Sequence, residues 1–132
     1  MKNNCIEISS NGLKKSLPDV ACNSLENNFF VFWAAAPGEE SQTADYFISG
    51  QKISNSGEAL GEPIEVLKTE NIVLLPRVVY NPNKNQYMVI YCSGENYFNI
   101  RGVILDANGR AVGEHFKVTD VPGNQFHYTM AF

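Results

Sequence analysis

The chain has 132 residues, of which 44% are apolar and 18% charged, a composition typical of one globular domain and not of a disordered segment. Its 10 Lys and Arg residues against 14 Asp and Glu residues give a net charge of -4 without any basic run, which argues against a nucleic-acid partner. The longest apolar stretches, 29–36 and 72–75, are far shorter than the about 20 residues that span a bilayer. We therefore expect no membrane insertion, and we find no secretory signal in the chain as given.

The three cysteines, Cys5, Cys22 and Cys92, form no C-x-x-C pair and are too few for a disulfide framework. Because the number is odd, at least one thiol is free. Cys22 and Cys92 fall within strand-like segments, where a free cysteine usually behaves as a small buried apolar side chain. The sequence leaves the chemical state of all three open.

An internal repeat dominates the sequence, and a long period of this kind dictates the fold. The first block of the repeat recurs 58 positions later, and the second block recurs 52 positions later, because the second copy lacks 6 residues of the intervening loop. A third block follows at the shorter spacing. The matching blocks are 18–33 with 76–91, 48–57 with 100–109, and 61–66 with 113–118.

Each copy predicts four short strands, since its segments of four to eight residues are rich in Val, Ile, Phe and Tyr and end at Gly, Asn and Pro. The second strand, 29–33 or 87–91, is apolar throughout, which is typical of a strand covered on both faces. Between the third and fourth strands, Gly57 and Gly109 close tight hairpin turns. Segment 5–8 matches a fourth strand, and segment 128–132 matches a first strand.

Four antiparallel strands repeated about every 50 residues predict an all-β, β-propeller-like fold with two complete blades and one extra strand at each end. The whole chain forms a single repeat region. Its predicted parts are an outer strand at 5–10, blade 1 at 18–66, blade 2 at 76–118, and the first strand of an incomplete third blade at 125–132.

The repeat pattern resembles the tandem propeller repeats of large secreted or surface-attached bacterial and archaeal proteins. The residues that carry this resemblance are the Pro-x-Val-Ala-x-Asn block from Pro18, the apolar strand ending at Trp33, and the Gly-x-x-Ile-Ser-x-x-Gly-x-x-x-Gly-Glu block from Gly50. The resemblance covers nearly the whole chain and implies a propeller fold in an extracellular or cell-surface setting. It implies no catalytic residue and no cofactor, because the shared positions are turn glycines and core residues.

Two blades alone leave two wide faces uncovered, and two solutions stay open. Three copies could assemble into a six-bladed ring, or the chain could be part of a longer propeller. The strand count favours the second solution, because pairing the terminal strands of neighbouring copies would still leave a blade without its second and third strands.

For most of the histidines and carboxylates, the sequence predicts structural roles and not catalysis or metal binding. His115 and His127 lack the spacing of metal ligands, so we expect each to face solvent or a neighbouring blade. Glu39, Glu40 and Asp45 lie in the long loop of the first copy, where nothing fixes the geometry of a catalytic carboxylate pair. The turn that begins at Asp106 lacks the later ligands of a calcium loop and is predicted to be a hairpin turn. We expect no metal site.

The aromatic residues indicate a function. Trp33 and Tyr91 end the second strands, and Tyr46 with Phe47 and Tyr97 with Phe98 precede the third strands at equivalent places. An aromatic ring once per blade can stack on the apolar face of a sugar. The predicted ligand-binding residues are Tyr46, Tyr97, Trp33, Tyr91 and Phe98. The competing interpretation, core packing between blades, is stronger for Trp33 and Tyr91.

The sequence therefore predicts a non-enzymatic binding or scaffolding module with a carbohydrate or protein ligand at the loops between blades. Two alternatives remain open. The chain could belong to a larger propeller hydrolase or lyase whose catalytic residues lie in other blades, or it could be a purely structural repeat of a surface protein. Self-association through the open blade faces is a further prediction.

Overall fold

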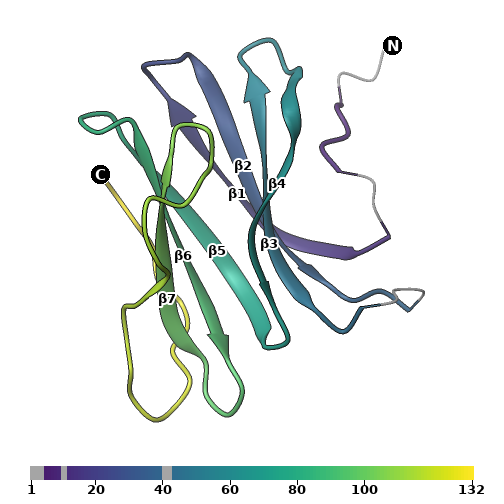
Figure 1. The fold of residues 1–132 in the computed structure, drawn as a ribbon, viewed down its shortest axis with the longest axis vertical. Coiled ribbons are helices and arrows are strands. Elements are labelled where there is room, and N and C mark those ends of the chain that lie inside the picture. Colours follow the sequence, from purple (N-terminus) through teal and green to yellow (C-terminus); the bar gives the residue numbers. More distant parts are fainter. Residues whose placement is uncertain (1–4, 10–11, 40–42) are drawn as a thin grey trace.

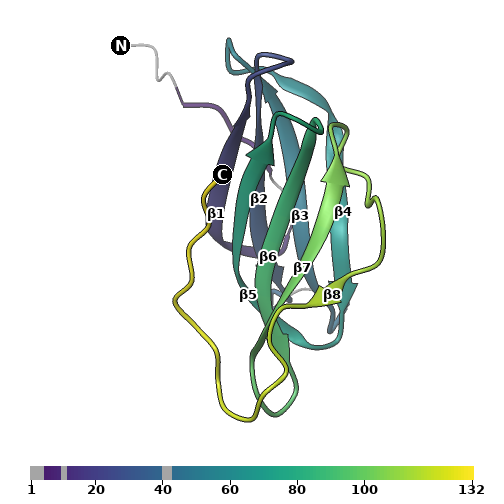
Figure 2. The ribbon, with the colours of Figure 1, turned by 90° about the vertical axis from the view of Figure 1, so that its left-hand side faces the viewer.

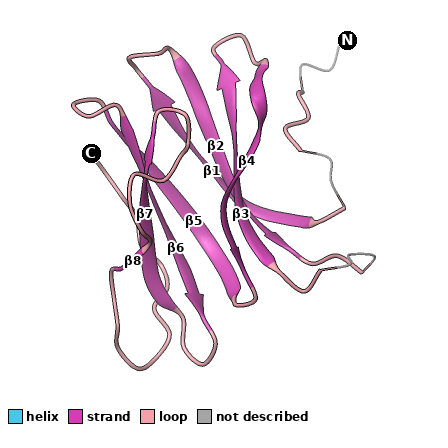
Figure 3. Cartoon of the chain, viewed as in Figure 1, coloured by secondary structure: helices cyan, strands magenta, loops and turns pink. Residues whose placement is uncertain are grey.

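The computed structural model describes residues 5–9, 12–39 and 43–132, and it confirms the all-β class. The described residues form two antiparallel sheets of four strands each and no helix (Figures 1 and 3). They accordingly contain no helix long and apolar enough to cross a membrane. Sheet 1 follows the order β1-β2-β3-β4 and sheet 2 the order β5-β6-β7-β8, so each sheet is a simple meander.

The strands of sheet 1 are β1 (Lys14–Asn23), β2 (Asn28–Ala36), β3 (Tyr46–Ser54) and β4 (Ala59–Thr69). Those of sheet 2 are β5 (Ile72–Asn81), β6 (Gln86–Gly94), β7 (Asn99–Asp106) and the two-residue β8 (Phe116–Lys117). The strands match the predicted order, but β1, β4 and β5 extend several residues beyond the predicted bounds.

The hairpin turns of the two sheets have the same geometry, as the repeat predicts. Gly57 has a φ of 90° and its amide donates to the Ser54 carbonyl at 3.0 Å, while Gly109 has a φ of 83° and donates to the Asp106 carbonyl at 3.0 Å. A left-handed φ is readily accessible only to glycine. This requirement explains why the glycine recurs at the same point of both copies.

The strand registers show that positions 58 apart, or 52 apart after the shortened loop, are structurally equivalent. Phe32 pairs with Gly50 in sheet 1, and the equivalent Ile90 pairs with Gly102 in sheet 2. Both first strands also bulge at an equivalent Leu-Pro step, where Leu17 and Leu75 have φ values of 55° and 54°. We call such pairs equivalent positions below.

The core lies between the two sheets, whose facing surfaces we call their inner faces (Figures 1 and 2). Phe30 stacks on Phe32 with ring centroids 4.7 Å apart, and the edge of Tyr87 from sheet 2 meets Phe30 at 5.3 Å. Val89 and Tyr91 continue this layer on β6. Side chains alternate along a strand, so the outer faces carry Phe29, Val31 and Trp33 on β2 and Met88, Ile90 and Cys92 on β6.

Two polar contacts join the sheets at their first strands and turns. Asp19 on β1 accepts a hydrogen bond from the backbone amide of Val78 on β5 at 2.9 Å, which caps the edge of that strand. At the turns, Asn23 donates to Asn85 at 3.0 Å, and Asn85 in turn donates to Glu26 at 3.3 Å. These contacts fix how the sheets sit on one another.

The terminal segments lie over the outer faces and are not strands. Residues 5–9 have no regular structure and lie beside sheet 1, where Ile6 and Ile8 border a groove with Val31 and Trp33. Residues 118–132 are equally irregular, and the last of them run along the outer side of sheet 2 (Figure 2). The structure thus differs from the expected strands at 5–10 and 125–132, because neither segment has a neighbouring strand with which to form a ladder. Residue 10 lies outside the described residues.

The sequence predicts burial of Cys22 and Cys92, and the structure confirms it for Cys92 alone. Cys92 is fully buried and its thiol donates to the Gln125 carbonyl at 3.0 Å. Burial raises the pKa of this thiol. Cys22, by contrast, is exposed, so its predicted burial is wrong. It points to the outer face of sheet 1, which no second sheet covers.

Candidate functional site

The five predicted ligand-binding residues occupy three different environments. Tyr91 is 1% exposed and belongs to the core between the sheets, and Trp33 is also buried, on the other face of sheet 1. The position of Tyr91 fits core packing between blades, whereas Trp33 lies beside Ile6 and Ile8 and not between the two sheets. Tyr46 and Phe98 are half-buried, and Tyr97 is 52% exposed. Of the five, Tyr97 offers the most ring surface to a ligand.

The strand register corrects the expected alignment of the loop aromatics by one residue. Phe47 pairs with Ala35, and Asn99 pairs with Ser93, the equivalent of Ala35. Asn99 is therefore equivalent to Phe47, which makes Phe98 and not Tyr97 the counterpart of Tyr46. This shift explains why Tyr46 and Phe98 are both half-buried while Tyr97 projects outward.

The loop that carries Tyr97 is tightly folded between β6 and β7. A Cβ on Gly94 would lie 1.9 Å from the Tyr97 carbonyl oxygen, so only glycine permits the chain to approach itself so closely. Glu95 and Asn96 at the tip are exposed. The result is an aromatic ring in solvent, flanked by an acid and an amide, on a backbone of restricted freedom.

The C-terminal segment braces this loop from the side. The Phe98 amide donates to the Asn124 side chain at 3.0 Å, and the Phe98 carbonyl accepts from the Gln125 amide at 2.7 Å. The rings of Phe98 and Phe126 pack with centroids 5.4 Å apart. Both backbone groups of Phe98 are therefore engaged, which holds the adjacent Tyr97 in place. The candidate site consists of loop 94–98 and segment 124–126.

The corresponding loop of sheet 1 is different. Asp45, the equivalent of Tyr97, accepts from the Thr43 hydroxyl at 2.6 Å and pairs with Lys68 at 3.3 Å. The Thr43 hydrogen bond, followed by Lys68, holds the pKa of this carboxyl below its ordinary value. Tyr46 packs against the core. The structure thus does not repeat an exposed aromatic once per sheet.

The remaining carboxylates have local roles. Asp106 uses its side chain to accept the amides of Asn108 and Arg110 at 2.9 and 3.0 Å, which fits the predicted hairpin turn. Glu40, one of the loop acids named above, lies outside the described residues. Within 5–9, 12–39 and 43–132, no three His, Cys, Asp or Glu side chains cluster in a way that would hold a metal ion.

His115 lies at the junction of the two sheets, one of the two environments that the sequence predicts for it. Its Nδ1 is 2.7 Å from the Tyr91 hydroxyl, and the two rings meet edge to face. Burial lowers the pKa of His115 more than a hydrogen bond to the backbone of Val66 raises it, and the charge of Arg101 adds to the lowering. The neutral imidazole is therefore the form that this junction favours.

A polar cluster that the sequence did not predict lies at the opposite end of the sheets. Glu26 accepts from Asn28 at 3.2 Å, from Asn85 and from Lys52. Burial alone would raise the pKa of Glu26, but these hydrogen bonds and the Lys52 charge together lower it. The repeated asparagine at equivalent positions 27 and 85 is the sequence feature that could have pointed to these turns. Both residues have the left-handed backbone conformation that asparagine tolerates. The cluster joins two turns, and it leaves the Oδ1 of Asn28 buried without a hydrogen-bond partner among the described residues.

No protein-family model matches the chain, and searches of curated proteins and of solved structures return no significant match.

Proposed function

We propose that the chain is a non-enzymatic binding module of the β-propeller type, with its ligand at the loops where the two sheets end. A saccharide is the ligand class that the loop chemistry favours. Tyr97 offers an apolar ring face to solvent, and the neighbouring Glu95 and Asn96 supply groups that hydrogen-bond to hydroxyls.

The observation that carries the proposal is the combination of an exposed ring with a braced backbone. Ordering a mobile loop on binding costs free energy, and a loop held in advance avoids that cost. Gly94 and the two backbone hydrogen bonds of Phe98 provide this restraint at Tyr97. The equivalent Asp45 has no ring to offer.

Two features support the propeller type. Each sheet is a four-stranded meander that packs face to face on the next, and the equivalent positions of the two sheets point in the same direction along the stack. The first strands of both sheets lie at the same side, linked by Asp19 and Val78.

The test is a glycan-array screen of the intact chain, followed by titration of any hit. Tyr97→Ala is expected to reduce affinity about fivefold or more without changing the fold, since stacked aromatic contacts contribute about 1–3 kcal/mol when the ring is lost. Tyr46→Phe, which keeps the half-buried ring at the other loop, is the control and should bind normally. Binding that survives Tyr97→Ala would contradict the proposed site, and silence on the array would favour a scaffolding role.

A further inference from the structure

Several side chains on the outer face of sheet 1 are exposed, whereas the side chains at the equivalent positions of sheet 2 are buried between the sheets. Val78 and Tyr87 lie between the sheets and are 9% and 1% exposed. Their equivalents, Val20 and Phe29, are 53% and 37% exposed on the outer face. The outer face of sheet 1 therefore has the composition of a sheet–sheet interface but has no sheet against it.

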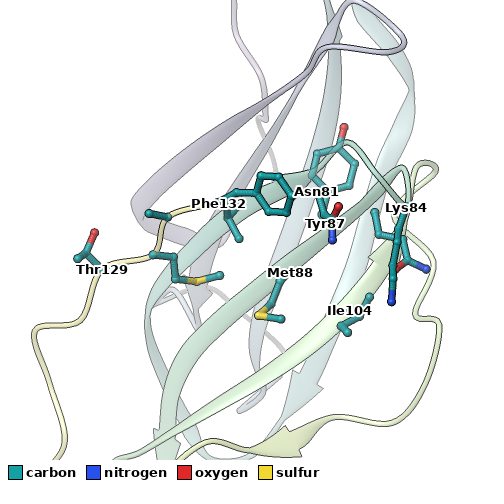
Figure 4. A pocket seen from close by; sticks show the side chains of 11 residues that line it. Asn81, Lys84, Tyr87, Met88, Ile104, Thr129 and Phe132 are labelled. Carbon is teal, nitrogen blue, oxygen red and sulfur yellow. The ribbon is translucent and has the colours of Figure 1, made fainter.

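The outer face of sheet 2 has the complementary character. Sheet 1 packs against sheet 2 through Ala21, Phe30 and Phe32. The equivalent residues on the outer face of sheet 2 are Val79, Met88 and Ile90. A groove of about 510 Å³ crosses this face, lined by Met88, Val79 and Ile104 and bordered by the C-terminal Met130 and Phe132 (Figure 4). Toward β8, Val112 and Phe116 are exposed.

The terminal segments occupy the places where strands of neighbouring sheets would lie. Ile6 reaches over Gly57, whose added Cβ would lie 3.9 Å from Ile6 Cδ1, just as Ile64 of β4 covers the equivalent Gly109. At the other end, the last residues follow the pattern of β5. Met130 and Phe132, 52 positions after Val78 and Tyr80, border the groove on sheet 2.

We propose that a second copy of this chain docks head to tail, with the outer face of its sheet 1 on the outer face of sheet 2 of the first copy. Docking displaces residues 5–9 and 129–132, the parts of the terminal segments that border the two outer faces, and leaves 124–126 in place. The contact between the sheets within one chain is the template for this interface, because equivalent positions meet in both. Such an interface joins two different surfaces, so it propagates into a ring or an open stack and does not stop at a pair.

One position makes the contact between copies weaker than the contact within the chain. Asp19 accepts the Val78 amide in the internal interface, but its equivalent on sheet 2 is Arg77, which has no acceptor for the equivalent amide of Val20. Displacement of the terminal segments also opposes docking. We therefore expect reversible, concentration-dependent association.

The test uses two full-length variants that each disable one face. Phe29→Asp places a charge on the outer face of sheet 1, and Met88→Asp places one on the outer face of sheet 2. By analytical ultracentrifugation each variant alone is expected to stay at the 14.7 kDa of one chain, while their mixture forms a species of twice that mass that cannot grow further. Circular dichroism checks the folding of each, and Val20→Asp and Val79→Asp replace a variant that fails to fold.

Leu25→Asp is the matched control, since Leu25 is exposed in the turn after β1 and its equivalent is the polar Asn83. This variant should associate like the unmodified chain. Arg77→Asn restores an acceptor and should tighten association roughly fivefold to tenfold, the value of about one hydrogen bond.

Two results would overturn the proposal: a mixture of the two face variants that does not combine, or a face variant that still associates alone. Neither result bears on the saccharide site, because Tyr97 is on the loop end and not on the outer faces. Failure of one proposal is therefore distinguishable from failure of the other.

Discussion

The two sheets have the same plan but different surroundings, and their comparison separates what the repeat determines from what neighbours determine. Phe29 and Tyr87 occupy equivalent positions on β2 and β6, yet Phe29 is partly in solvent and Tyr87 is in the core. The same contrast holds for the exposed Cys22 and the buried Tyr80. The repeat sets the strands and turns, while burial depends on whether a second sheet covers the face.

The largest expected difference in the free energy of unfolding is between substitutions of Phe30 and Phe29, adjacent rings on the two faces of β2. Phe30→Ala removes a ring packed against Phe32 and Tyr87 and should lower the free energy of unfolding by about 3–5 kcal/mol. Phe29→Ala, on the outer face, should cost about 1 kcal/mol, because much of that ring is already in water. Urea denaturation of both variants measures the difference, and equal losses would contradict the assignment of the inner face.

The equivalent turn glycines provide the next comparison. Gly57→Ala adds a methyl group that meets little, so its cost is the left-handed strain of about 1–2 kcal/mol. Gly109→Ala carries the same strain, and its Cβ would also lie 2.2 Å from Ile64 and 2.8 Å from Phe30. Overpacking adds about 1–3 kcal/mol, so Gly109→Ala should be clearly less stable. Thermal unfolding at matched pH is the measurement, and identical melting temperatures would argue against close packing of β4 on sheet 2.

A third comparison concerns the polar link between the first strands. Asp19→Ala leaves the Val78 amide without its acceptor and should cost about 1–2 kcal/mol. Arg77→Ala, at the equivalent position of sheet 2, should change stability by about 0.5 kcal/mol or less. Denaturant titration compares the two, and hydrogen exchange at Val78 should accelerate only in the Asp19 variant.

The smallest expected effect is the pH dependence of stability that His115, at the junction of the two sheets, produces. Because burial lowers the folded-state pKa of His115 below its ordinary 6.5, the unfolded chain binds this proton more readily in acid. Stability should therefore decrease as the pH falls below 6.5 and level off once the folded-state imidazole is also protonated. His115→Gln should remove this part of the pH profile. An unchanged profile in that variant would place the titration elsewhere.

Local features of the fold were predictable from the sequence. Gly57 and Gly109 mark turns through their own backbone preferences, and the apolar runs from Phe29 and Tyr87 mark central strands. Features that depend on long-range contacts were not predictable. The exposure of Cys22 depends on the lack of a covering sheet, and the bond between Asn23 and Asn85 joins residues 62 positions apart.

The candidate site was predictable only in part. The aromatic residues before the third strands indicate the two loops, but the expected match of Tyr97 to Tyr46 departs by one residue from the 52-position spacing of the repeat, which pairs Tyr46 with Phe98. The strand register agrees with the 52-position spacing, and the side-chain exposure shows that Tyr97 and not Phe98 projects into solvent. The bracing of this loop by Asn124 and Gln125 depends on a chain segment that has no strand of its own.

The solution mass of the unmodified chain, measured by light scattering over a concentration series, tests most directly whether the outer faces are interfaces. Stacking of copies predicts a mass that rises with concentration from 14.7 kDa toward multiples of it, with three copies as the six-sheet ring. A mass that stays at 14.7 kDa at every concentration would contradict it.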